Sequence, residues 1–411
     1  MTIRVLLLTQ WFDPEPTFKG LAFARELVRR GFEVEVVTGY PNYPVGRLYP
    51  GYKLRLLRRE IVDGVKIARV LLYPSHDRSA FRRVLNYASF GLSSFIYGLF
   101  AAGRADVIYA YHPPLSVGIT ASLIRMLRRR PVVYDIQDMW PDTLRATGML
   151  NSKSALGMVS AVCNWVYRNV DRIVVLSPGF KSMLIERGVP GSKIDVIYNW
   201  ADEQSLSVAA GTLPACFPGP ERFKIVFAGN MGKAQHLDTV IDAAVLLQDS
   251  GSKVSFVLVG GGVDVGHLRE RVQRLALRNV VFVPPVPMSE IGKFLGAADA
   301  LLVHLRNDRL FEITIPSKIQ AYMAIGRPLI VALRGDGADL VRSSGGGILA
   351  EPEDAKSIAS AAEQLAGMSQ SLLEEMAGNS RRYYGEHLAI SHGTERFARL
   401  FERLAADRES E

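Results

Sequence analysis

The sequence predicts an α/β protein with two domains of similar size, each built around a parallel β-sheet. At 411 residues the chain is too long for a typical single hydrophobic core and suits two domains of about 200 residues each. With 48% hydrophobic and 22% charged residues, its composition is that of a packed globular protein. The chain begins with strand Ile3–Thr9, helix Gly20–Gly31 and strand Glu33–Thr38. Such a βαβ unit is typical of a doubly wound parallel sheet.

Short apolar runs continue this alternation and predict two Rossmann-like sheets. The segment Ala209–Pro220 is rich in small residues and proline, which indicates a linker between them. The further strands expected before it are Asp106–Tyr111, Val132–Ile136, Arg172–Ser177 and Lys193–Tyr198. Those expected after it are Phe223–Ala228, Val254–Val259, Val280–Val283, Ala300–Val303, Pro328–Val331 and Gly347–Leu349, with helices between them such as Leu237–Leu247 and His267–Ala276.

These elements predict domains at residues 1–205 and 221–390, with residues 206–220 as the linker. A C-terminal helix at about 391–406 is expected to pack back on the first domain. Ligands of such folds bind outside the carboxyl ends of the strands. We therefore expect the two parallel sheets to face each other across a cleft that holds the site.

The composition of the chain limits the classes of ligand and macromolecule that it is expected to bind. The net charge of +8 is either ordinary surface charge or an attraction to an anionic membrane or a phosphorylated substrate. Basic runs interleaved with stacking aromatic residues are absent, so no nucleic-acid partner is expected. Cys163 and Cys216 are the only cysteines, which excludes a disulfide framework and a Cys-rich metal site. No other motif has metal-ligand spacing, so no metal or cofactor is expected. Met1–Leu8 does not read as a signal peptide, and the cytoplasm is the expected compartment.

Val84–Gly103 is an uncharged segment of 20 residues between Arg83 and Arg104. Its length would suit a transmembrane helix. A span, however, would separate the first strands from Asp106–Tyr111, with which they should share one sheet. We therefore expect a helix that is part core and part interfacial, with the flanking arginines touching lipid phosphates. A plain core helix and a true span are the alternatives.

The stretch from Glu312 to Gln320, followed by Gly326-Arg-Pro328, predicts a loop that feeds a helix. The N–H groups at the start of such a helix are a ready site for a phosphate. Pro316, Ser317 and Lys318 would form this start, and Glu312 would meet whatever the phosphate carries. An acidic residue near the positive end of a helix would explain Glu312 equally well.

Two glycine turns follow strands in the same domain. Gly229 and Gly232 would let the backbone approach a ligand closely, and Lys233 offers a cation for a diphosphate. The alternative is an ordinary turn with a solvated lysine. Val259-Gly-Gly-Gly262 is a second such run, for which a structural tight turn is an equal explanation.

Polar residues also follow strands in the first domain. The loop Asp13–Gly20 carries Glu15 and Lys19, both expected to face the cleft. Tyr134–Asp142 places three aspartates and a Trp-Pro at the end of a strand, where burial without a purpose would be costly. Within it, Asp138 is expected to act as acceptor base or to position the acceptor. The remaining candidates on this side have structural alternatives, namely loop anchoring for Asp135, packing for Trp140 and a structural role for His112.

The layout from Glu312 to Pro328 resembles the donor site of glycosyltransferase family 4, which has the GT-B fold. In that family two acidic residues separated by seven hold the nucleotide sugar. The resemblance implies that Glu312 contacts the donor sugar beside its anomeric carbon. The second position is Gln320 here, which keeps an acceptor oxygen for the ribose. Where the family has Arg and Lys on the diphosphate, this chain has Asn230 and Gln235, so Lys233 or Lys318 would supply the cation.

Further donor contacts are implied only by this resemblance. Gly20 matches the family's first-domain glycine loop near the donor phosphate and sugar. Gly261 belongs to the Gly-x-Gly element on the cleft floor, and Val283 to the segment whose backbone reads the nucleobase. Asp138 lies where family members place a His or Asp near the reacting centre.

The resemblance covers nearly the whole chain and is greatest to bacterial O-antigen and capsule transferases such as the N-acetyl-L-fucosamine (L-fucosamine) transferases. It implies an acceptor domain followed by a donor domain. The implied reaction is metal-independent, retaining transfer of a hexosyl or N-acetylaminosugar unit from a UDP-sugar to a lipid-linked, undecaprenyl diphosphate-type saccharide. The enzyme would be peripheral on the cytoplasmic face of the anionic inner membrane. A UDP-sugar 2-epimerase of the same architecture and a non-catalytic sugar-nucleotide-binding protein are the alternatives.

Overall fold

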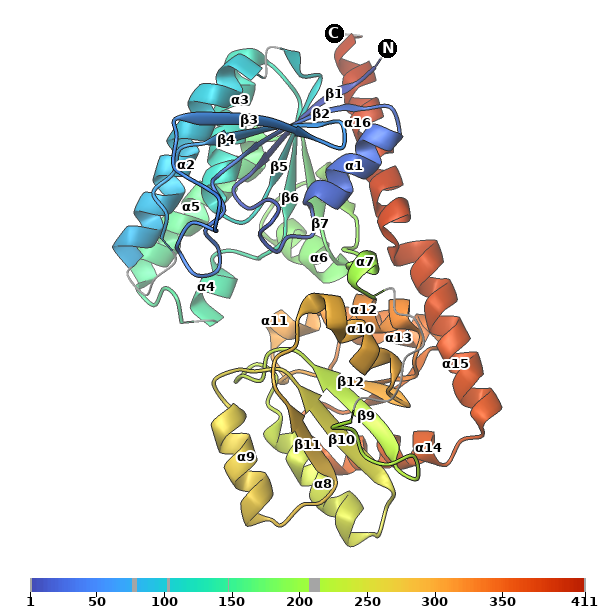
Figure 1. Cartoon of the computed structure of the whole chain (residues 1–411). Coiled ribbons are helices and arrows are strands. Elements are labelled where there is room, and N and C mark those ends of the chain that lie inside the picture. The colour runs from blue at the N-terminus through green and yellow to red at the C-terminus, as the bar shows by residue number, and fades with distance from the viewer. Residues whose placement is uncertain (1, 76–79, 102–103, 147, 207–214, 410–411) are drawn as a thin grey trace. The chain divides into compact units, whose positions relative to one another are not determined.

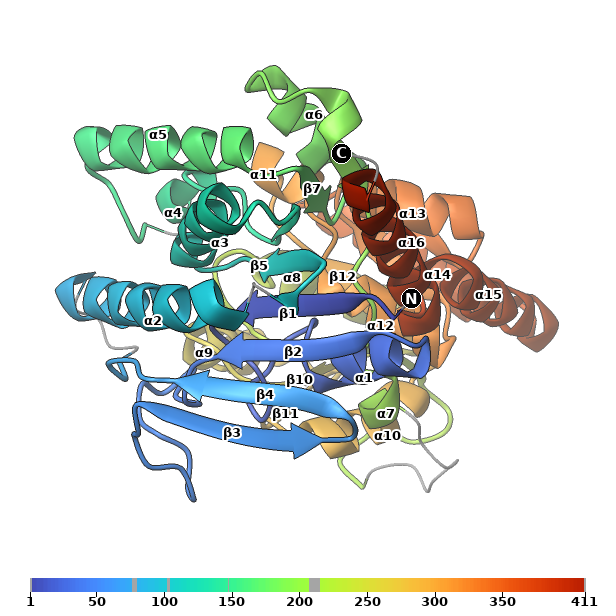
Figure 2. The same ribbon diagram turned by 90° about the horizontal axis from the view of Figure 1, so that it is seen from above.

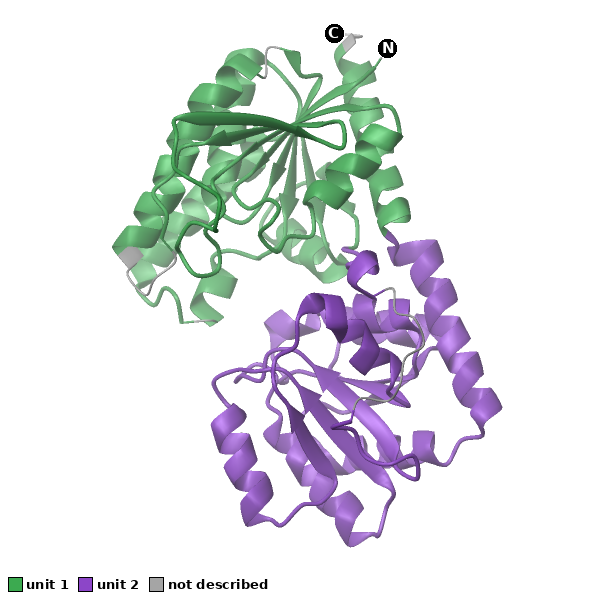
Figure 3. Ribbon diagram, viewed as in Figure 1, with its two compact units in different colours: residues 1–198, 390–411 green, residues 199–389 purple. Residues whose placement is uncertain are grey.

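The computed structural model describes residues 2–75, 80–101, 104–146, 148–206 and 215–409. It divides into two compact units, shown in different colours in Figure 3. The first unit comprises Met1–Tyr198 together with Ile390–Glu411, and the second comprises Asn199–Ala389. The chain therefore leaves the first unit once and returns to it with its last helix.

The first unit is built on a sheet whose described part has eight strands in the order β3-β4-β2-β1-β5-β6-β7-β8 (Figures 1 and 2). All neighbouring strands are parallel except the edge strand β3. The strands are β1 (Arg4–Thr9), β2 (Glu33–Thr38), β3 (Leu57–Val62), β4 (Val65–Val70), β5 (Val107–Tyr111), β6 (Val132–Ile136), β7 (Arg172–Val175) and β8 (Ile194–Val196). The central strands β5 and β6 are buried at every position, as expected for a sheet covered on both faces.

The strands β3 and β4 are a correction to the sequence-based reading, which assigned no strand between Glu33–Thr38 and Asp106–Tyr111. They form an antiparallel hairpin in which Val62 pairs with Val65. Its turn is Asp63-Gly64, and both residues have positive φ, 51° and 82°. This dipeptide is a strong hairpin signal that could have located both strands. The polar composition of β3, which alternates between exposed and half-buried positions, hid it from a search for buried runs.

Helices cover both faces of this sheet (Figure 2). They are α1 (Leu21–Arg29), α2 (Ala80–Ala101), α3 (Leu115–Arg128), α4 (Asp142–Ala146), α5 (Lys153–Asn169), α6 (Pro178–Glu186) and α16 (Ile390–Glu409). Helix α2 packs beside α3, and α3 beside α5. The C-terminal helix α16 packs beside α1, where the ring of Phe397 lies 5.2 Å from Phe23 and 5.3 Å from Tyr109.

The second unit has a parallel sheet with the strand order β11-β10-β9-β12-β13-β14 in its described part. Its strands are β9 (Phe223–Ala228), β10 (Val254–Val259), β11 (Val280–Val283), β12 (Ala300–His304), β13 (Leu329–Ala332) and β14 (Gly347–Ala350). Its helices are α7 (Glu203–Leu206), α8 (Asp238–Asp249), α9 (Val265–Arg274), α10 (Met288–Gly296), α11 (Arg309–Glu312), α12 (Ser317–Ile325), α13 (Asp336–Ser344), α14 (Ala355–Ala366) and α15 (Gln370–Tyr383), followed by a π-helical turn at Tyr384–Leu388. Each strand expected in this domain is present within a residue or two of its predicted bounds.

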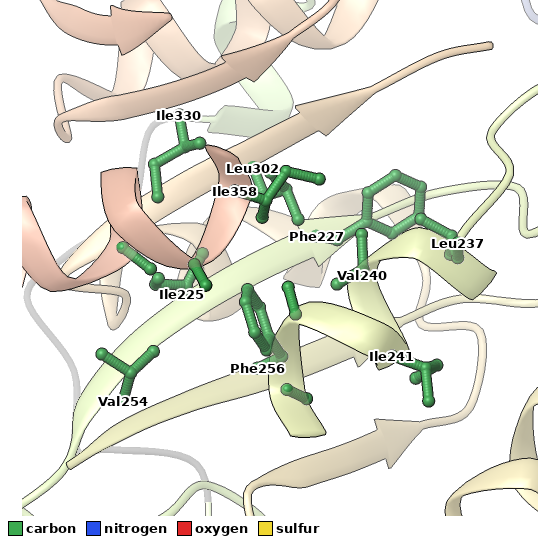
Figure 4. Close-up of a cluster of buried hydrophobic side chains, with 14 of the residues drawn as sticks. Ile225, Phe227, Leu237, Val240, Ile241, Val254, Phe256, Leu302, Ile330 and Ile358 are labelled. Atoms are coloured by element: carbon green, nitrogen blue, oxygen red, sulfur yellow. The ribbon is translucent and has the colours of Figure 1, made fainter. Parts of the chain in front are cut away.

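The core of the second unit lies between the sheet and helices α8 and α14 (Figure 4). Side chains from β9, β10, β12 and β13 interdigitate there with side chains from the two helices. Every labelled side chain in Figure 4 is buried, namely Ile225, Phe227, Leu237, Val240, Ile241, Val254, Phe256, Leu302, Ile330 and Ile358. This close packing holds the carboxyl ends of the strands in fixed register.

The boundary between the units differs from the predicted one at residue 205. Residues 199–206 belong to the second unit because Tyr384 holds them there. Its hydroxyl accepts a hydrogen bond from the Ala201 N–H (3.1 Å) and donates one to Glu203 (2.7 Å). Most of the predicted linker, residues 207–214, lies outside the described residues. Within its remainder, Phe217 is buried and packs 5.9 Å from the ring of Phe294.

We expect Phe256→Ala to destabilise the second unit by about 3–5 kcal/mol, because it removes a fully buried ring and leaves a cavity. Urea unfolding followed by circular dichroism would measure the change. Val263→Ala, at a position 84% exposed, should cost no more than about 0.5 kcal/mol. Equal effects of the two substitutions would contradict this account of the core.

Candidate active site

The residues of the second unit that were predicted to bind the donor gather at the carboxyl edge of its sheet, where the loop after β9 meets the start of α12. Gly229, the first residue after β9, has φ +130°, a conformation that side chains rarely adopt. A Cβ atom at this position would lie 2.8 Å from Cε of Lys318 and 3.2 Å from its Nζ. The backbone after β9 and the Lys318 side chain are therefore in direct contact.

A buried tyrosine holds α12 at the end of β9. Tyr322 is 1% exposed, and its hydroxyl accepts a hydrogen bond of 2.8 Å from the Ala228 N–H. Helix α12 begins at Ser317, which is exposed, after Pro316 in an extended conformation. The Tyr322 bond therefore places the first turn of α12 next to the loop after β9. No sequence motif marked Tyr322, because its role depends on a contact across 94 positions of the chain.

Lys318 is a partly buried cation next to this loop. Its Nζ lies 3.5 Å from the ring centroid of Phe227, and no carboxylate among the described residues forms an ion pair with it. Burial lowers the pKa of the Lys318 ammonium to about 7. A cation that lacks a counter-charge and lies beside glycine backbone is well suited to an anionic group such as a diphosphate.

The glycine run after β10 has a structural role in addition to the predicted one. Gly260 and Gly262 have φ +134° and +147°, and a Cβ on either would meet a carbonyl oxygen of the loop after β9, at 2.1 Å and 2.2 Å. The predicted residue Gly261 lies between them and accepts the Met231 N–H at 2.7 Å. The carbonyl of Val283, at the end of β11, accepts the Gly260 N–H at 2.9 Å. Glycine is thus required here for contact between two loops of the chain itself.

Asn230 and Gln235 stabilise the loop after β9 from within. The Gln235 side-chain carbonyl accepts the Gly232 N–H at 3.2 Å and the Asn230 amide at 3.3 Å. Lys233 is exposed, and in the described part of the chain it has neither an ion pair nor a side-chain hydrogen bond. Of the two candidate cations, only Lys318 is therefore held in place by its surroundings.

Gln320 is buried in α12 with an unused acceptor. Its side chain is 2% exposed, and its Oε1 has no hydrogen-bond partner among the described residues. An unsatisfied buried carbonyl is costly, and a hydroxyl group from a ligand would satisfy it. This observation agrees with the predicted contact to a ribose, which stays a prediction.

Glu312 ends the short helix α11, five residues before α12. Its backbone N–H donates to the Asp308 carbonyl (3.1 Å), while in the described part of the chain its carboxylate forms neither a hydrogen bond nor an ion pair and interacts with Arg334 only through space. Gly335, with φ +75°, passes close to the backbone of Glu312, since a Cβ there would lie 2.0 Å from its carbonyl oxygen. The backbone of Glu312 is therefore fixed from two sides, and its carboxylate remains available.

His304, the last residue of β12, was not singled out by the sequence reasoning and connects two loops at the same edge. Its Nδ1 lies 2.6 Å from the Gln235 carbonyl, and its Nε2 accepts the Glu353 N–H at 3.2 Å. Burial lowers the pKa of the imidazole to about 4, so the ring is neutral and Nδ1 is the donor. It thus ties the loop after β9 to the loop after β14 in a single tautomer.

In the first unit the predicted acceptor-side residues include a buried charged pair. Lys19 and Asp135 are both buried and interact electrostatically, and Tyr109 donates a hydrogen bond of 2.5 Å to the Asp135 carboxylate. Gln137 donates a second bond, also of 2.5 Å. Burial lowers the pKa of Lys19 to about 8 and raises that of Asp135, while the two charges oppose these shifts. The pair thus anchors the loop after β1 to the end of β6.

Glu15 and Gly20 also shape the loop after β1. The Glu15 carboxylate accepts the N–H groups of Asn42 and Tyr43, both at 2.7 Å, and is buried. Gly20 precedes α1, and a Cβ there would lie 2.2 Å from a carboxylate oxygen of Asp13. This oxygen accepts the N–H of Leu21, the first residue of α1, at 2.6 Å. A carboxylate of the chain therefore occupies the helix N-terminus at which Gly20 was predicted to meet a phosphate.

His112 and Trp140 are in edge-to-face contact, with ring centroids 5.2 Å apart. His112 is buried, and its Nδ1 has no hydrogen-bond partner among the described residues. Burial lowers the pKa of the imidazole to about 3, which keeps the ring neutral. The Trp140 carbonyl accepts a hydrogen bond of 3.0 Å from Arg187. Both residues therefore pack at the ends of β5 and β6, and neither carries a charge.

Asp138 differs from Asp135 in having an available carboxylate. Its side chain is half-buried, and in the described residues neither a hydrogen bond nor an ion pair holds it. Burial raises the pKa of this carboxyl group. A carboxylate with a raised pKa and no cationic partner is suited to accept a proton, which is the role predicted for Asp138.

The two groups of residues belong to different units. Nowhere in the described ranges do three or more His, Cys, Asp or Glu side chains lie close enough together to hold a metal ion. The functions predicted for the individual residues stay predictions, because geometry alone does not test them.

Comparison with known proteins agrees with this architecture. Residues 21–200 match the family model described as a glycosyl transferase 4-like domain, and residues 222–367 match that of glycosyl transferases group 1. WcaI of Escherichia coli (strain K12), named as a glycosyl transferase of colanic acid biosynthesis, is 27% identical over 93% of this chain and 96% of its own.

Two solved structures show the same fold. Sucrose-phosphate synthase from Thermosynechococcus elongatus aligns with a TM-score of 0.74 at 16% identity, covering 98% of this chain and 100% of that one. HepE from Anabaena, solved in complex with UDP, aligns with a TM-score of 0.68 at 16% identity over the same shares. The chain belongs to the GT-B glycosyltransferases, with a glycosyl transferase 4-like first domain and a group 1 second domain.

We expect Asp135→Asn to destabilise the first unit by about 3–5 kcal/mol, because it leaves Lys19 buried without its counter-charge. Urea unfolding would measure the loss. The double variant Lys19→Met/Asp135→Leu, which removes both charges together, should recover much of it. A cost below about 1 kcal/mol for the single variant would contradict an anchoring role.

Proposed function

We propose that this glycosyltransferase moves a hexosyl or N-acetylaminosugar unit from a UDP-sugar to a lipid-linked saccharide, with retention of anomeric configuration. The acceptor lipid would be of the undecaprenyl diphosphate type, met at the cytoplasmic face of the inner membrane during surface polysaccharide assembly. The observation that carries the proposal is the contact between the side chain of Lys318, at the start of α12, and Gly229, which follows β9. It brings a cation without a counter-charge, free backbone N–H groups and glycine backbone together where a diphosphate would bind.

The names and titles of similar proteins support this choice of donor and process. HepE from Anabaena was solved with UDP and with UDP-glucose, and a trehalose-6-phosphate protein from E. coli with UDP-2-fluoro glucose. The name of WcaI refers to colanic acid biosynthesis.

The chemistry would depend on charge at the leaving group. As the bond between the anomeric carbon and the phosphate oxygen breaks, negative charge develops on the diphosphate, where the Lys318 ammonium would stabilise it. The acceptor hydroxyl would attack from the same face and pass its proton to the departing phosphate oxygen. No enzyme nucleophile is then required. Preorganised positive charge is the main catalytic contribution in this scheme, worth several kcal/mol in such sites.

Other residues would orient the reactants. The available carboxylate of Glu312 would accept hydrogen bonds from hydroxyls of the donor sugar, next to the anomeric carbon. The unused Oε1 of Gln320 would accept one from the ribose. Asp138 would position the acceptor or take up a proton from it.

UDP binding should depend on the protonation of Lys318. Because its pKa is about 7 in the free protein and a diphosphate favours the charged form, UDP affinity should fall as pH rises above about 7. Isothermal titration of UDP, GDP and ADP would measure both the pH dependence and the choice of base. Lys318→Met should weaken UDP binding about tenfold or more and remove the pH dependence, whereas Lys356→Met, at an exposed lysine, should change neither. Wild-type UDP affinity in Lys318→Met would contradict the assignment of Lys318 as the cation that binds the diphosphate.

Glu312→Gln should abolish sugar transfer while leaving UDP affinity within about threefold, because the side chain would contact the sugar and not the nucleotide. Release of UDP in the presence of lipid-linked acceptor would measure transfer, and Glu375→Gln, an exposed residue of α15, is the matched control. Full activity of Glu312→Gln would contradict its role. If the wild-type protein interconverts UDP-sugars without an acceptor, it is an epimerase. If it binds UDP and turns over no donor, it is a non-catalytic binding protein.

A further inference from the structure

Helix α2 exposes its large apolar side chains and buries mainly small and polar ones, the reverse of an ordinary helix in a globular protein. Its buried side carries Asn86, Phe90, Ser94 and Gly98, of which only Phe90 is large and apolar. Its exposed side carries a stripe of large apolar side chains at helical spacing, whereas a soluble protein normally turns such a stripe inward. The stripe consists of Phe81 (71% exposed), Val84 (61%), Leu85 (39%), Leu92 (63%), Ile96 (53%) and Phe100 (73%).

Specific contacts hold α2 in this orientation. Asn86 donates to the Tyr73 carbonyl at 2.6 Å and accepts a hydrogen bond of 2.5 Å from Gln10, next to β1. Where α2 meets α3, a Cβ on Gly98 would lie 2.7 Å from the Ile124 side chain. The small residues thus allow a close helix–helix contact. Turning the apolar stripe inward would break these bonds and fill that contact with bulky side chains.

Helix α3 extends the same surface. It lies beside α2 (Figure 2), and Arg128 near its end donates a hydrogen bond of 2.7 Å to the Leu99 carbonyl of α2. Its own exposed large apolar side chains are Leu123 (36%), Met126 (57%) and Leu127 (62%). We call this stripe and these three residues together the α2–α3 surface.

The charged residues of α2, α3 and the segments at their ends are all basic. Arg82 is exposed near the start of α2, and Arg104, Arg128 and Arg129 are exposed near the ends of the two helices. The sequence contains no Asp or Glu from 80 to 105 or from 115 to 130. An apolar surface with arginines at both ends and no acidic residue complements a layer of anionic headgroups above acyl chains.

A groove of about 1230 Å³ adjoins the C-terminal end of α2. It lies between this end and strands β1 to β4, and its lining includes Arg59, Ile61, Phe100 and Arg104. Ile61 and Phe100 are each 73% exposed, so the apolar stripe continues into the groove. Neither Arg59 nor Arg104 forms an ion pair in the described part of the chain.

The acidic residues of the groove are already engaged. Glu33 pairs with Arg4 (3.7 Å) and Lys66 (3.6 Å), and Glu35 accepts the Tyr97 hydroxyl at 2.6 Å. Glu60 pairs with Arg58 (2.9 Å) and Arg69 (2.8 Å). The guanidinium of Arg59 lies 5.6 Å from the ring centroid of Tyr97. The guanidinium groups of Arg59 and Arg104, beside the exposed apolar side chains of Ile61 and Phe100, are therefore left to meet a phosphate attached to hydrocarbon.

We propose that the α2–α3 surface lies on an anionic bilayer and that the groove binds the phosphate of a phospholipid headgroup. Helix α2 is long and apolar enough to cross a membrane by length and composition. It lies in the plane of the interface instead, because β4 before it and β5 after it belong to one sheet. A second copy of the chain is a poor occupant, since a symmetric contact would bring arginines against arginines. The inference goes beyond the proposed function and does not rest on it.

Co-sedimentation with vesicles tests this surface directly. Wild-type protein should bind vesicles of phosphatidylglycerol and phosphatidylethanolamine at least tenfold more tightly than vesicles of phosphatidylcholine, and salt should weaken the binding. Leu92→Ser/Ile96→Ser/Phe100→Ser and Arg59→Glu/Arg104→Glu should each raise the half-saturating lipid concentration at least tenfold. The matched control Leu246→Ser/Leu372→Ser, at exposed leucines of the second unit (39% and 49%), should leave it unchanged.

Circular dichroism and UDP titration of the same variants separate this inference from folding and from the proposed function. All variants should keep the wild-type unfolding temperature and UDP affinity, because the substituted residues are exposed or open to the groove. Those of the triple and the arginine variants lie outside the donor-binding unit, and Leu246 and Leu372 lie within it but outside the candidate donor site. Unchanged vesicle binding by the apolar triple variant would overturn the proposal. So would a wild-type dimer in light scattering that this variant converts to a monomer. If the triple variant loses vesicle binding and Arg59→Glu/Arg104→Glu keeps it, the headgroup site in the groove is overturned.

Discussion

The hydrogen bond between the Tyr322 hydroxyl and the Ala228 N–H is the interaction on which the candidate donor site depends. It joins the first turns of α12 to the end of β9 in a fully buried environment. Because β9 is an inner strand of the second sheet, this bond fixes the position of α12 relative to the core of the sheet. The contact between Lys318 and Gly229 follows from it.

At the carboxyl edge of the second sheet, glycine and histidine residues outside the candidate donor site hold its loops in place. Gly260 and Gly262 let the loops after β9 and β10 touch, and the neutral His304 ties the loop after β9 to that after β14. These residues hold the loop after β9, whose Gly229 contacts Lys318. In the first unit the pair Lys19–Asp135 has a comparable role at the ends of β1 and β6. In both units the most deeply buried polar groups position the site, while half-buried Asp138 and Glu312 keep unpaired carboxylates.

Helix α2 shows how the surroundings of a segment decide what its sequence means. Its composition is equally that of a core helix or of a membrane span. Packing against α3 through Gly91, Ser94 and Gly98 leaves its large apolar side chains outside. The flanking strands keep it from crossing a bilayer, since they share one sheet. The segment is thus suited to lie on a membrane, which is where a lipid-linked acceptor would be met.

The sequence by itself determined the fold class, because the strand and helix periods of Ile3–Thr38 and of the second domain are local properties of the chain. It also located Gly229, Glu312 and Lys318 as site candidates, through their positions after a strand or near the start of a helix, and Gln320 through the resemblance to a family. It could not distinguish Lys318 from Lys233, or locate Tyr322 and His304, because burial and pairing arise from contacts between distant segments. Only the tertiary structure decided which carboxylates stay unpaired and which face of α2 is exposed. Both depend on packing partners that no local pattern encodes.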